Sequence, residues 1–172
     1  MNEIIKALTE RRSIRKYKPD MIPMETVKRI AEAGSYAATG MNRQSPIIIA
    51  VTDKEMRDRL SKMNAAVMGS DRDPFYGAPV VLIVLADKSV GTAIYDGSLV
   101  MGNLMLAAYS EGVGSCWIHR AKQEFESEEG RAILHDLGIE GDYEGIGHCI
   151  LGYPDCDHPA APPRKENYIY YV

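Results

Sequence analysis

The sequence lacks the features that mark several large classes of protein. Its three cysteines form no C-x-x-C pair, so neither a disulfide framework nor a structural zinc site is expected. No run of lysine and arginine forms a basic stripe and the formal net charge is −4, so nucleic acid is not an expected partner. The longest apolar runs, such as residues 80–86, are too short to span a bilayer. The first residues also lack the apolar core of a signal peptide, so we expect a cytoplasmic protein that does not associate with membranes.

The signatures of hydrolases, metalloenzymes and common nucleotide-binding folds are absent as well. The chain contains no phosphate-binding G-x-x-x-x-G-K-[ST] loop, no H-E-x-x-H helix and no G-x-S-x-G elbow. Residues 145–147 (GIG) lack the third glycine of the dinucleotide fingerprint. The four histidines have no metal-ligand spacing. We therefore expect no metal site and no side chain that acts as a catalytic nucleophile.

The composition is that of a globular chain in which helices and strands alternate. Of the 172 residues, 45% are apolar and 26% are charged, and no repeat or linker divides them, so we expect a single domain over residues 1–172. Hydrophobic periodicity predicts helices over residues 2–10, 24–36, 53–67, 92–111 and 126–137. It predicts strands over residues 47–51, 80–86, 115–118 and 145–151. Because the alternation lacks strict βαβ regularity, the predicted class is α+β, with a layered sheet-and-helix core.

Two predicted elements indicate a second copy of the chain. The helix over residues 92–111 is apolar on nearly every side and must be buried on nearly every side, which in so short a chain suggests that a partner subunit shares it. Gly97 and Gly102 would let another backbone approach this helix closely. The last residues, 168–172, are aromatic and β-branched and could add an edge strand to another sheet, such as the partner's.

Positive charge gathers in residues 11–17 (RRSIRKY), the basic segment, immediately after the first predicted helix. One interpretation is that these cations complement the negative end of the helix dipole. The other is that guanidinium groups and a serine hydroxyl bind a phosphate dianion, since arginine can bind phosphate in bidentate fashion. Charge alone does not decide between the two.

A second segment, residues 37–46 (AATGMNRQSP), is called the polar loop and follows the second predicted helix. One interpretation is an ordinary helix C-cap and turn, with Gly40 in a left-handed conformation. The other is that Asn42 and Gln44 offer hydrogen-bond donors and acceptors to a flat heterocycle that lies against the small residues. The segment by itself does not distinguish these interpretations.

Taken in order, these segments resemble the FMN-binding nitroreductase family. The matching pieces extend over nearly the whole chain: residues 11–17, 39–46, 75–79 (FYGAP), 112–118 (GVGSCWI), 151–154 (LGYP) and 164–165 (RK). The resemblance implies a nitroreductase-like, three-layer α+β fold in which helices flank a central, mainly antiparallel sheet. It also implies an intertwined homodimer with C-terminal strand exchange and with FMN bound between the subunits.

The resemblance further implies which residues hold the phosphate of FMN. They come from both ends of the chain: Arg11, Arg12, Ser13 and either Arg164 or Lys165. Arg15 would lie near the N1–O2 edge of the isoalloxazine, where reduced flavin carries negative charge that a guanidinium stabilises.

The ring itself would be contacted by two other groups of residues. One group reaches it from the other subunit and consists of Ala38, Thr39, Gly40 and Asn42, with Gln44 as a further candidate. The second group lines the edge near N5, largely through backbone atoms, and consists of Trp117, Ile118, His119 and Arg120.

Three details are left open by the sequence. Ser45 precedes the proline where the family often has Gln-Pro directly, so the register of the polar loop is uncertain by one residue. His119 occupies a position that often holds glycine or glutamate, and it is either a proton donor or a part of the site wall. Asn64 either contacts the pyrimidine edge of the flavin or is a helix-surface amide.

The activity that the resemblance implies is a ping-pong hydride transfer. NADH or NADPH would reduce the flavin at N5, and an electron-poor acceptor such as a nitroaromatic or a quinone would then reoxidise it. The alternatives are a specialised reductase of enones or halogenated aromatics, and a non-catalytic sensor that binds FMN or another nucleotide. The sequence does not choose between NADH and NADPH.

Overall fold

An antiparallel sheet of four strands forms the middle of the structure, a computed structural model that describes residues 2–172. The strands are β1 (Pro46–Val51), β2 (Val80–Asp87), β3 (Gly114–Ile118) and β4 (Tyr143–Gly152), arranged in the order β1-β2-β4-β3. Every neighbouring pair is antiparallel. In β2 the first seven positions are buried, which explains its continuous apolar sequence, because a strand covered on both faces has no polar side.

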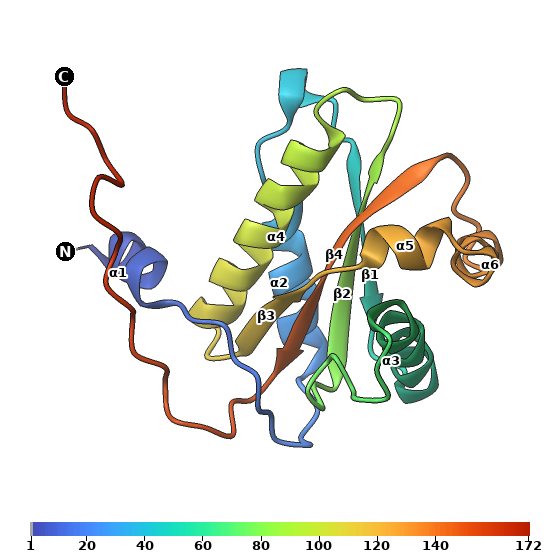
Figure 1. Cartoon of the computed structure of the whole chain (residues 1–172), viewed down its shortest axis with the longest axis horizontal. Helices are drawn as coiled ribbons and strands as arrows, with labels where there is room; N and C mark the ends of the chain where they lie inside the picture. The colour runs from blue at the N-terminus through green and yellow to red at the C-terminus, as the bar shows by residue number, and fades with distance from the viewer. Residues whose placement is uncertain (1) are drawn as a thin grey trace.

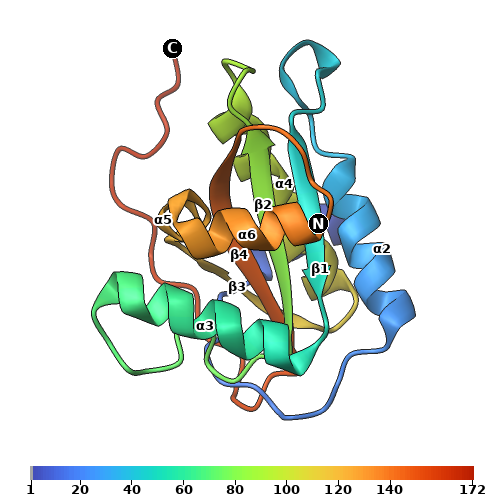
Figure 2. The same ribbon diagram turned by 90° about the vertical axis from the view of Figure 1, so that its right-hand side faces the viewer.

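Helices cover both faces of the sheet and give three layers (Figure 1). On one face lie α2 (Met24–Ser35) and α4 (Ala93–Ser110). On the other lie α3 (Lys54–Met68), α5 (Ala121–Glu126) and α6 (Glu128–Asp136), which Figure 2 shows in front of the sheet. The first helix, α1 (Glu3–Glu10), contacts α4 on the side away from the sheet. The predicted α+β class with a layered core is confirmed.

Side-chain caps set several helix boundaries where the sequence predicts them. The Asn2 side chain accepts a hydrogen bond from Ile5 N at 2.9 Å and starts α1. Asp53 does the same for α3 through Met56 N at 2.8 Å. Gly69 ends α3 in a left-handed conformation with φ 67°. Each cap satisfies a terminal backbone group that the helix itself leaves free.

The predicted helix over residues 126–137 corresponds to α6, and an additional helix, α5, precedes it and ends at Glu126, just before Ser127. The Ser127 hydroxyl accepts from Gly130 N at 3.0 Å and caps α6. A Cβ at Gly130 would lie 2.0 Å from Glu124 O, so only glycine allows this close junction. No pattern in the sequence predicts α5.

The burial of α4 and the strand over residues 168–172 were both predicted, and neither is seen within a single chain. Helix α4 is not buried on nearly all sides, since the side chains of Tyr95 and Leu99 are 72% and 52% exposed. Gly97 admits the side chain of Ile146 rather than another backbone, and a Cβ at Gly102 would meet open space. Residues 168–172 form no strand within this chain. They end an exposed arm that runs along the α1 side of the molecule (Figure 1).

The described part of the chain, residues 2–172, contains neither a helix that could cross a membrane nor a cluster of metal-ligating side chains. None of its helices combines the length and the apolar character that crossing a bilayer requires. No group of three or more His, Cys, Asp or Glu side chains in this range is arranged to hold a metal ion.

Candidate functional site

The basic segment (residues 11–17) is fixed by backbone hydrogen bonds to the ends of two strands. Ile14 N donates to Ser115 O at 2.9 Å at the start of β3. Lys18 N donates to Tyr153 O at 2.9 Å, immediately after β4. The segment therefore lies beside the sheet edge, and its backbone is fixed by the sheet.

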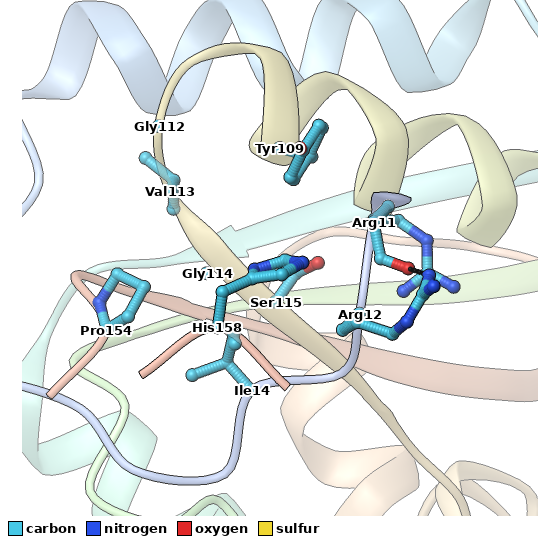
Figure 3. A pocket seen from close by; sticks show the side chains of 10 residues that line it. All are labelled: Arg11, Arg12, Ile14, Tyr109, Gly112, Val113, Gly114, Ser115, Pro154 and His158. Atoms are coloured by element: carbon cyan, nitrogen blue, oxygen red, sulfur yellow. Dashed lines mark hydrogen bonds between the residues drawn. The ribbon is translucent and has the colours of Figure 1, made fainter. Parts of the chain in front are cut away.

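The two arginines at the start of the basic segment line a pocket of about 170 Å³. Figure 3 shows the side chains of Arg11 and Arg12 next to each other at one side of it. The remaining walls come from the basic segment itself, from the end of α4, from the turn into β3, from the start of β3 and from the chain after β4: Ile14, Tyr109, Gly112, Val113, Gly114, Ser115, Pro154 and His158.

Both arginines have buried nitrogen atoms without a hydrogen-bond partner in residues 2–172. These atoms are Nη1 of Arg11 and Nε of Arg12. Arg12 also donates through Nη1 to Thr9 O at 2.8 Å, in the last turn of α1, which supports the helix-dipole interpretation for that residue. Neither guanidinium forms an ion pair with a carboxylate of the described chain. A buried donor nitrogen without a partner is costly, and an anion that accepted from these two nitrogens would remove that cost.

The other predicted phosphate ligands do not join this pocket within one chain. Ser13 is half-buried and Arg15 is exposed. Arg164 donates to Pro162 O at 2.9 Å on the exposed arm, and the Lys165 ammonium lies 5.4 Å from the centre of the Tyr168 ring. Among residues 2–172 no hydrogen bond or ion pair links the arm cations to the basic segment.

One buried carboxylate, that of Asp96 in the first turn of α4, organises the polar loop. Asp96 is 2% exposed and accepts from Gly40 N at 3.0 Å and from Ser45 Oγ at 2.7 Å. The Thr92 hydroxyl donates to it at 3.0 Å. Burial by itself would raise the pKa of Asp96, but these hydrogen bonds together lower it below its ordinary value. The sequence analysis missed this residue, although a lone carboxylate in an apolar helix is a visible signal.

The polar loop has an unusual backbone conformation. Met41, Asn42 and Gln44 have φ values of 51°, 54° and 49°, in the left-handed region. The interpretation that places Gly40 there is wrong, because Gly40 does not have a positive φ. Each left-handed residue other than glycine costs about 1–2 kcal/mol, so the loop is shaped by more than local preference.

The side chains of the polar loop are mostly accessible. Ala38, Asn42 and Gln44 are exposed, and Thr39 is half-buried. The Thr39 hydroxyl accepts from Gln44 N at 3.1 Å, and Gln44 Nε2 lies 3.3 Å from Asn42 Oδ1. The two amides therefore keep free hydrogen-bonding groups on a loop whose backbone is fixed.

The residues predicted at the N5 edge are the last two of β3 and the two that connect this strand to α5. We call this segment, residues 117–120, the β3–α5 turn. Ile118 is buried on the α3 side of the sheet, whereas Trp117 packs on the other face over Gly147, where a Cβ would lie 2.3 Å from the indole nitrogen. His119 is exposed. Arg120 has φ 78°, a left-handed conformation at the N-cap of α5.

Asn64 lies directly beneath this turn and is fully buried, so the interpretation as a helix-surface amide is wrong. Its Nδ2 donates to His119 O and to Glu124 Oε2, both at 2.8 Å. Its Oδ1 accepts from Arg120 Nε at 2.9 Å. Both amide hydrogens are therefore used within the protein. Glu124 and its partner His148 were not predicted; a histidine inside the apolar strand over residues 145–151 was the available signal.

The basic segment and the polar loop lie at opposite ends of α4 (Figure 1). The loop is tied to Thr92 and Asp96 at the start of the helix, and the pocket is lined by residues that follow its end. The 18 residues of α4 span about 27 Å at the usual rise per residue. One chain therefore presents the two segments at well-separated places.

Comparisons with known proteins were made against families, curated proteins and solved structures. The model of the Nitroreductase family matches residues 8–74 and 68–153. An FMN reductase [NAD(P)H] of Bacillus subtilis is 31% identical over 181 residues, covering 95% of this chain and 70% of that protein. The matched family range includes the basic segment, the polar loop and the β3–α5 turn, and it stops before Arg164.

Two crystal structures with bound FMN have the same fold. A nitroreductase from Bacteroides fragilis is 28% identical with a TM-score of 0.90, and the alignment covers 100% of both chains. A nitroreductase from Desulfitobacterium hafniense is 29% identical with a TM-score of 0.88, covering 100% of this chain and 99% of that one. The predicted nitroreductase-like fold of three layers is thereby confirmed.

Proposed function

The chain belongs to the nitroreductase family, and we propose that it is an FMN-dependent oxidoreductase that takes electrons from NADH or NADPH. Two similar crystal structures contain FMN, and a curated relative is an FMN reductase [NAD(P)H]. Residues 1–172 would form one FMN-binding domain.

The observation that carries this proposal is the pair of buried, unpartnered nitrogen atoms on Arg11 and Arg12. Two adjacent guanidinium groups repel each other, and a phosphate between them would both neutralise and hydrogen-bond them. The pocket, at about 170 Å³, suits a phosphate group rather than a whole flavin. Ser13 would add a hydroxyl, and the isoalloxazine would extend away from this pocket toward the β3–α5 turn.

The second half of the site would come from a partner copy in a homodimer. The polar loop and the basic segment are separated by the length of α4, so a symmetric partner would supply residues 38–44 to the ring. The exposed apolar side chains of α1 and α4 offer the interface, among them Ile4 (66%), Leu8 (56%) and Leu99 (52%). The arm, with Arg164 and Lys165, would pack on the partner and complete the phosphate site by strand exchange.

The protein's own residues would orient the cofactor and tune its charge. When bound, FMN supplies hydride transfer at N5 in two half-reactions, one with the nicotinamide and one with an electron-poor acceptor. Arg15, exposed within the basic segment, would stabilise the negative charge of the reduced ring. Trp117 and the backbone of the β3–α5 turn would line the N5 edge, and His119 would form part of the site wall.

Nitroaromatic and quinone acceptors fit the proposed site best. A chain of 172 residues has little room for an inserted lid over the ring. A flat, electron-poor molecule could then occupy the position that the nicotinamide has left. A specialised reductase would instead need contacts that recognise one substrate.

The test is to purify the protein, record its visible absorbance and add NADH or NADPH under anaerobic conditions. We expect a yellow protein whose flavin band bleaches with at least one nicotinamide and returns with a quinone or nitroaromatic. A colourless protein that takes up no added FMN would contradict the proposal. Tight FMN binding without reduction would favour the sensor alternative.

A further inference from the structure

Three polar side chains from three elements meet in the core behind the β3–α5 turn. Asn64 lies on α3, Glu124 on α5 and His148 on β4, and their exposed fractions are 0%, 1% and 0%. Glu124 Oε2 lies 2.6 Å from His148 Nε2 and accepts from Asn64 Nδ2 at 2.8 Å. We call these three residues the polar network.

Among side-chain hydrogen bonds, those of Asn64 connect the polar network to the turn. The Asn64 amide donates to His119 O and accepts from Arg120 Nε. Arg120 is the residue with the left-handed backbone, φ 78°, at the point where the chain leaves β3 and enters α5. A non-glycine residue keeps this conformation only when its surroundings impose it. The amide of Asn64 supplies that constraint from below.

Stability is a poor explanation for the polar network. Glu124 Oε1 and His148 Nδ1 are buried and have no partner in residues 2–172. A buried ionic or polar pair with unmade hydrogen bonds is commonly no more stabilising than apolar side chains of similar volume. The His148 ring is nevertheless held firmly, with Phe75 and Phe125 packed edge-on at centroid distances of 5.3 and 6.3 Å. The arrangement favours one orientation of these groups at the expense of stability.

We propose that Glu124 and His148, acting through Asn64, are positioning residues that hold the His119–Arg120 backbone against the N5 edge of the flavin. The inference rests on the proposed FMN function. His148 orients the Glu124 carboxylate, and the carboxylate orients the Asn64 amide. The amide then fixes the carbonyl of His119 and the guanidinium of Arg120. None of the three residues needs to touch the flavin, since both Asn64 hydrogens are already donated within the protein.

The inference predicts a graded series of variants. Asn64→Leu keeps the side-chain shape but cuts the link between the buried pair and the turn. Glu124→Gln keeps an acceptor but removes the charge that strengthens the hydrogen bonds. Glu126→Gln is the matched control, because Glu126 lies on the same helix with an exposed carboxylate that pairs with Lys122 at 3.0 Å.

Two readouts do not depend on flavin. Trp117 is the only tryptophan, so its fluorescence in the apoprotein reports directly on the turn. Hydrogen exchange of the backbone amides of residues 117–124 reports on the same segment. We expect altered Trp117 emission and faster exchange in Asn64→Leu, a smaller change in Glu124→Gln, and wild-type values in Glu126→Gln.

With FMN present, we expect the variants to change the rate of flavin reduction but not the affinity for FMN. The phosphate pocket lies elsewhere, so the Kd for FMN should stay within about threefold of wild type. The rate of reduction by nicotinamide should fall by about tenfold to a hundredfold in Asn64→Leu, because the ring is no longer held in register. Loss of FMN binding as large as the loss of rate would indicate a general packing role and would overturn the inference.

If the core variants fail to fold, Arg120→Lys tests the same link from the accessible side. It keeps the positive charge and removes the Nε donor to Asn64. Wild-type Trp117 emission, exchange and reduction rate in this variant would overturn the inference. Should the wild-type protein take up no FMN at all, the proposed function fails, whereas the apoprotein readouts still decide whether the network holds the turn.

Discussion

At the scale of single residues, Arg11 Nη1 and Arg12 Nε are buried and have no hydrogen-bond partner in residues 2–172. The sheet edge fixes the segment that carries them, so the two side chains cannot simply move into solvent without leaving the pocket wall. An anion bound by the two guanidinium groups would explain why they lie side by side. Exposed charges by themselves contribute little to stability.

Replacing either arginine should therefore weaken cofactor binding without weakening the fold. A hydrogen bond to a charged group contributes about 1.5–3 kcal/mol, so Arg11→Ala or Arg12→Ala should raise the Kd for FMN by about tenfold to a hundredfold. Fluorescence titration of the apoprotein measures this, with Arg29→Ala as control because Arg29 forms an exposed pair with Glu111. Equal affinity in all three variants would count against the phosphate pocket.

The carboxylate of Asp96 should contribute to stability in a pH-dependent way. Its pKa is lower in the folded chain than the ordinary value of about 4, so its contribution is present above that value and is lost as the pH falls through the folded pKa. We expect Asp96→Asn to lower the free energy of unfolding by about 1–3 kcal/mol at neutral pH. Denaturant unfolding should show this difference shrinking below pH of about 4.

The control for this measurement is Asp136→Asn, since Asp136 is exposed and distant from the polar loop. A difference between wild type and Asp96→Asn that stays constant down to low pH would mean that the carboxylate is not the ionised acceptor described above. In Asp96→Asn, the backbone amide hydrogens of the polar loop should exchange with solvent faster than in the wild-type protein.

At the scale of elements, α4 has apolar side chains on two sides, one packed within the chain and one exposed. Its inner side packs on the sheet and on α2, and its outer side exposes Tyr95 and Leu99. The apolar sequence on both sides is therefore explained only when a second copy covers the outer one.

Leu99→Glu should both dissociate the homodimer and abolish FMN binding. A buried, unpaired charge at an interface costs several kcal/mol, enough to shift the protein to monomers at micromolar concentration. Light scattering and FMN titration test this prediction. The control is Leu137→Glu, because Leu137 is equally exposed (51%) but directly follows α6, on the opposite face of the sheet. Dimers with bound FMN in Leu99→Glu would place the interface elsewhere.

Elements with their own caps or long apolar runs could be predicted from the sequence, and elements defined by distant partners could not. Asp53 and Gly69 mark both ends of α3, and residues 80–86 identify β2. Helix α5 has six residues and no apolar stripe of its own, so its position depends on contacts with β4 and α6. Residues 168–172 have the composition of a strand but find no partner within one chain.

The candidate site divides in the same way. The basic segment, the polar loop and the β3–α5 turn could be identified because each has an unusual local composition. The residues that hold them in place could not, because Asp96, Glu124 and His148 each depend on groups that lie far away in the sequence. Burial of Asn64 was misjudged for the same reason, since its partners come from the β3–α5 turn and α5.

At the scale of the whole molecule, the central claim is that one flavin site is shared by two chains. The basic segment of one chain would bind the phosphate, and the polar loop of its partner would contact the ring. The position of the two segments at opposite ends of α4 supports this proposal. It predicts that damage to the two segments can be complemented between subunits.

The most direct measurement mixes two defective chains with different affinity tags. One carries Arg11→Ala and Arg12→Ala, and the other carries Asn42→Ala and Gln44→Ala. Each homodimer should bind FMN poorly, whereas the heterodimer purified through both tags should regain one intact site and bind one FMN per dimer with wild-type affinity. A heterodimer that binds no more FMN than its two parents would contradict a site shared between chains.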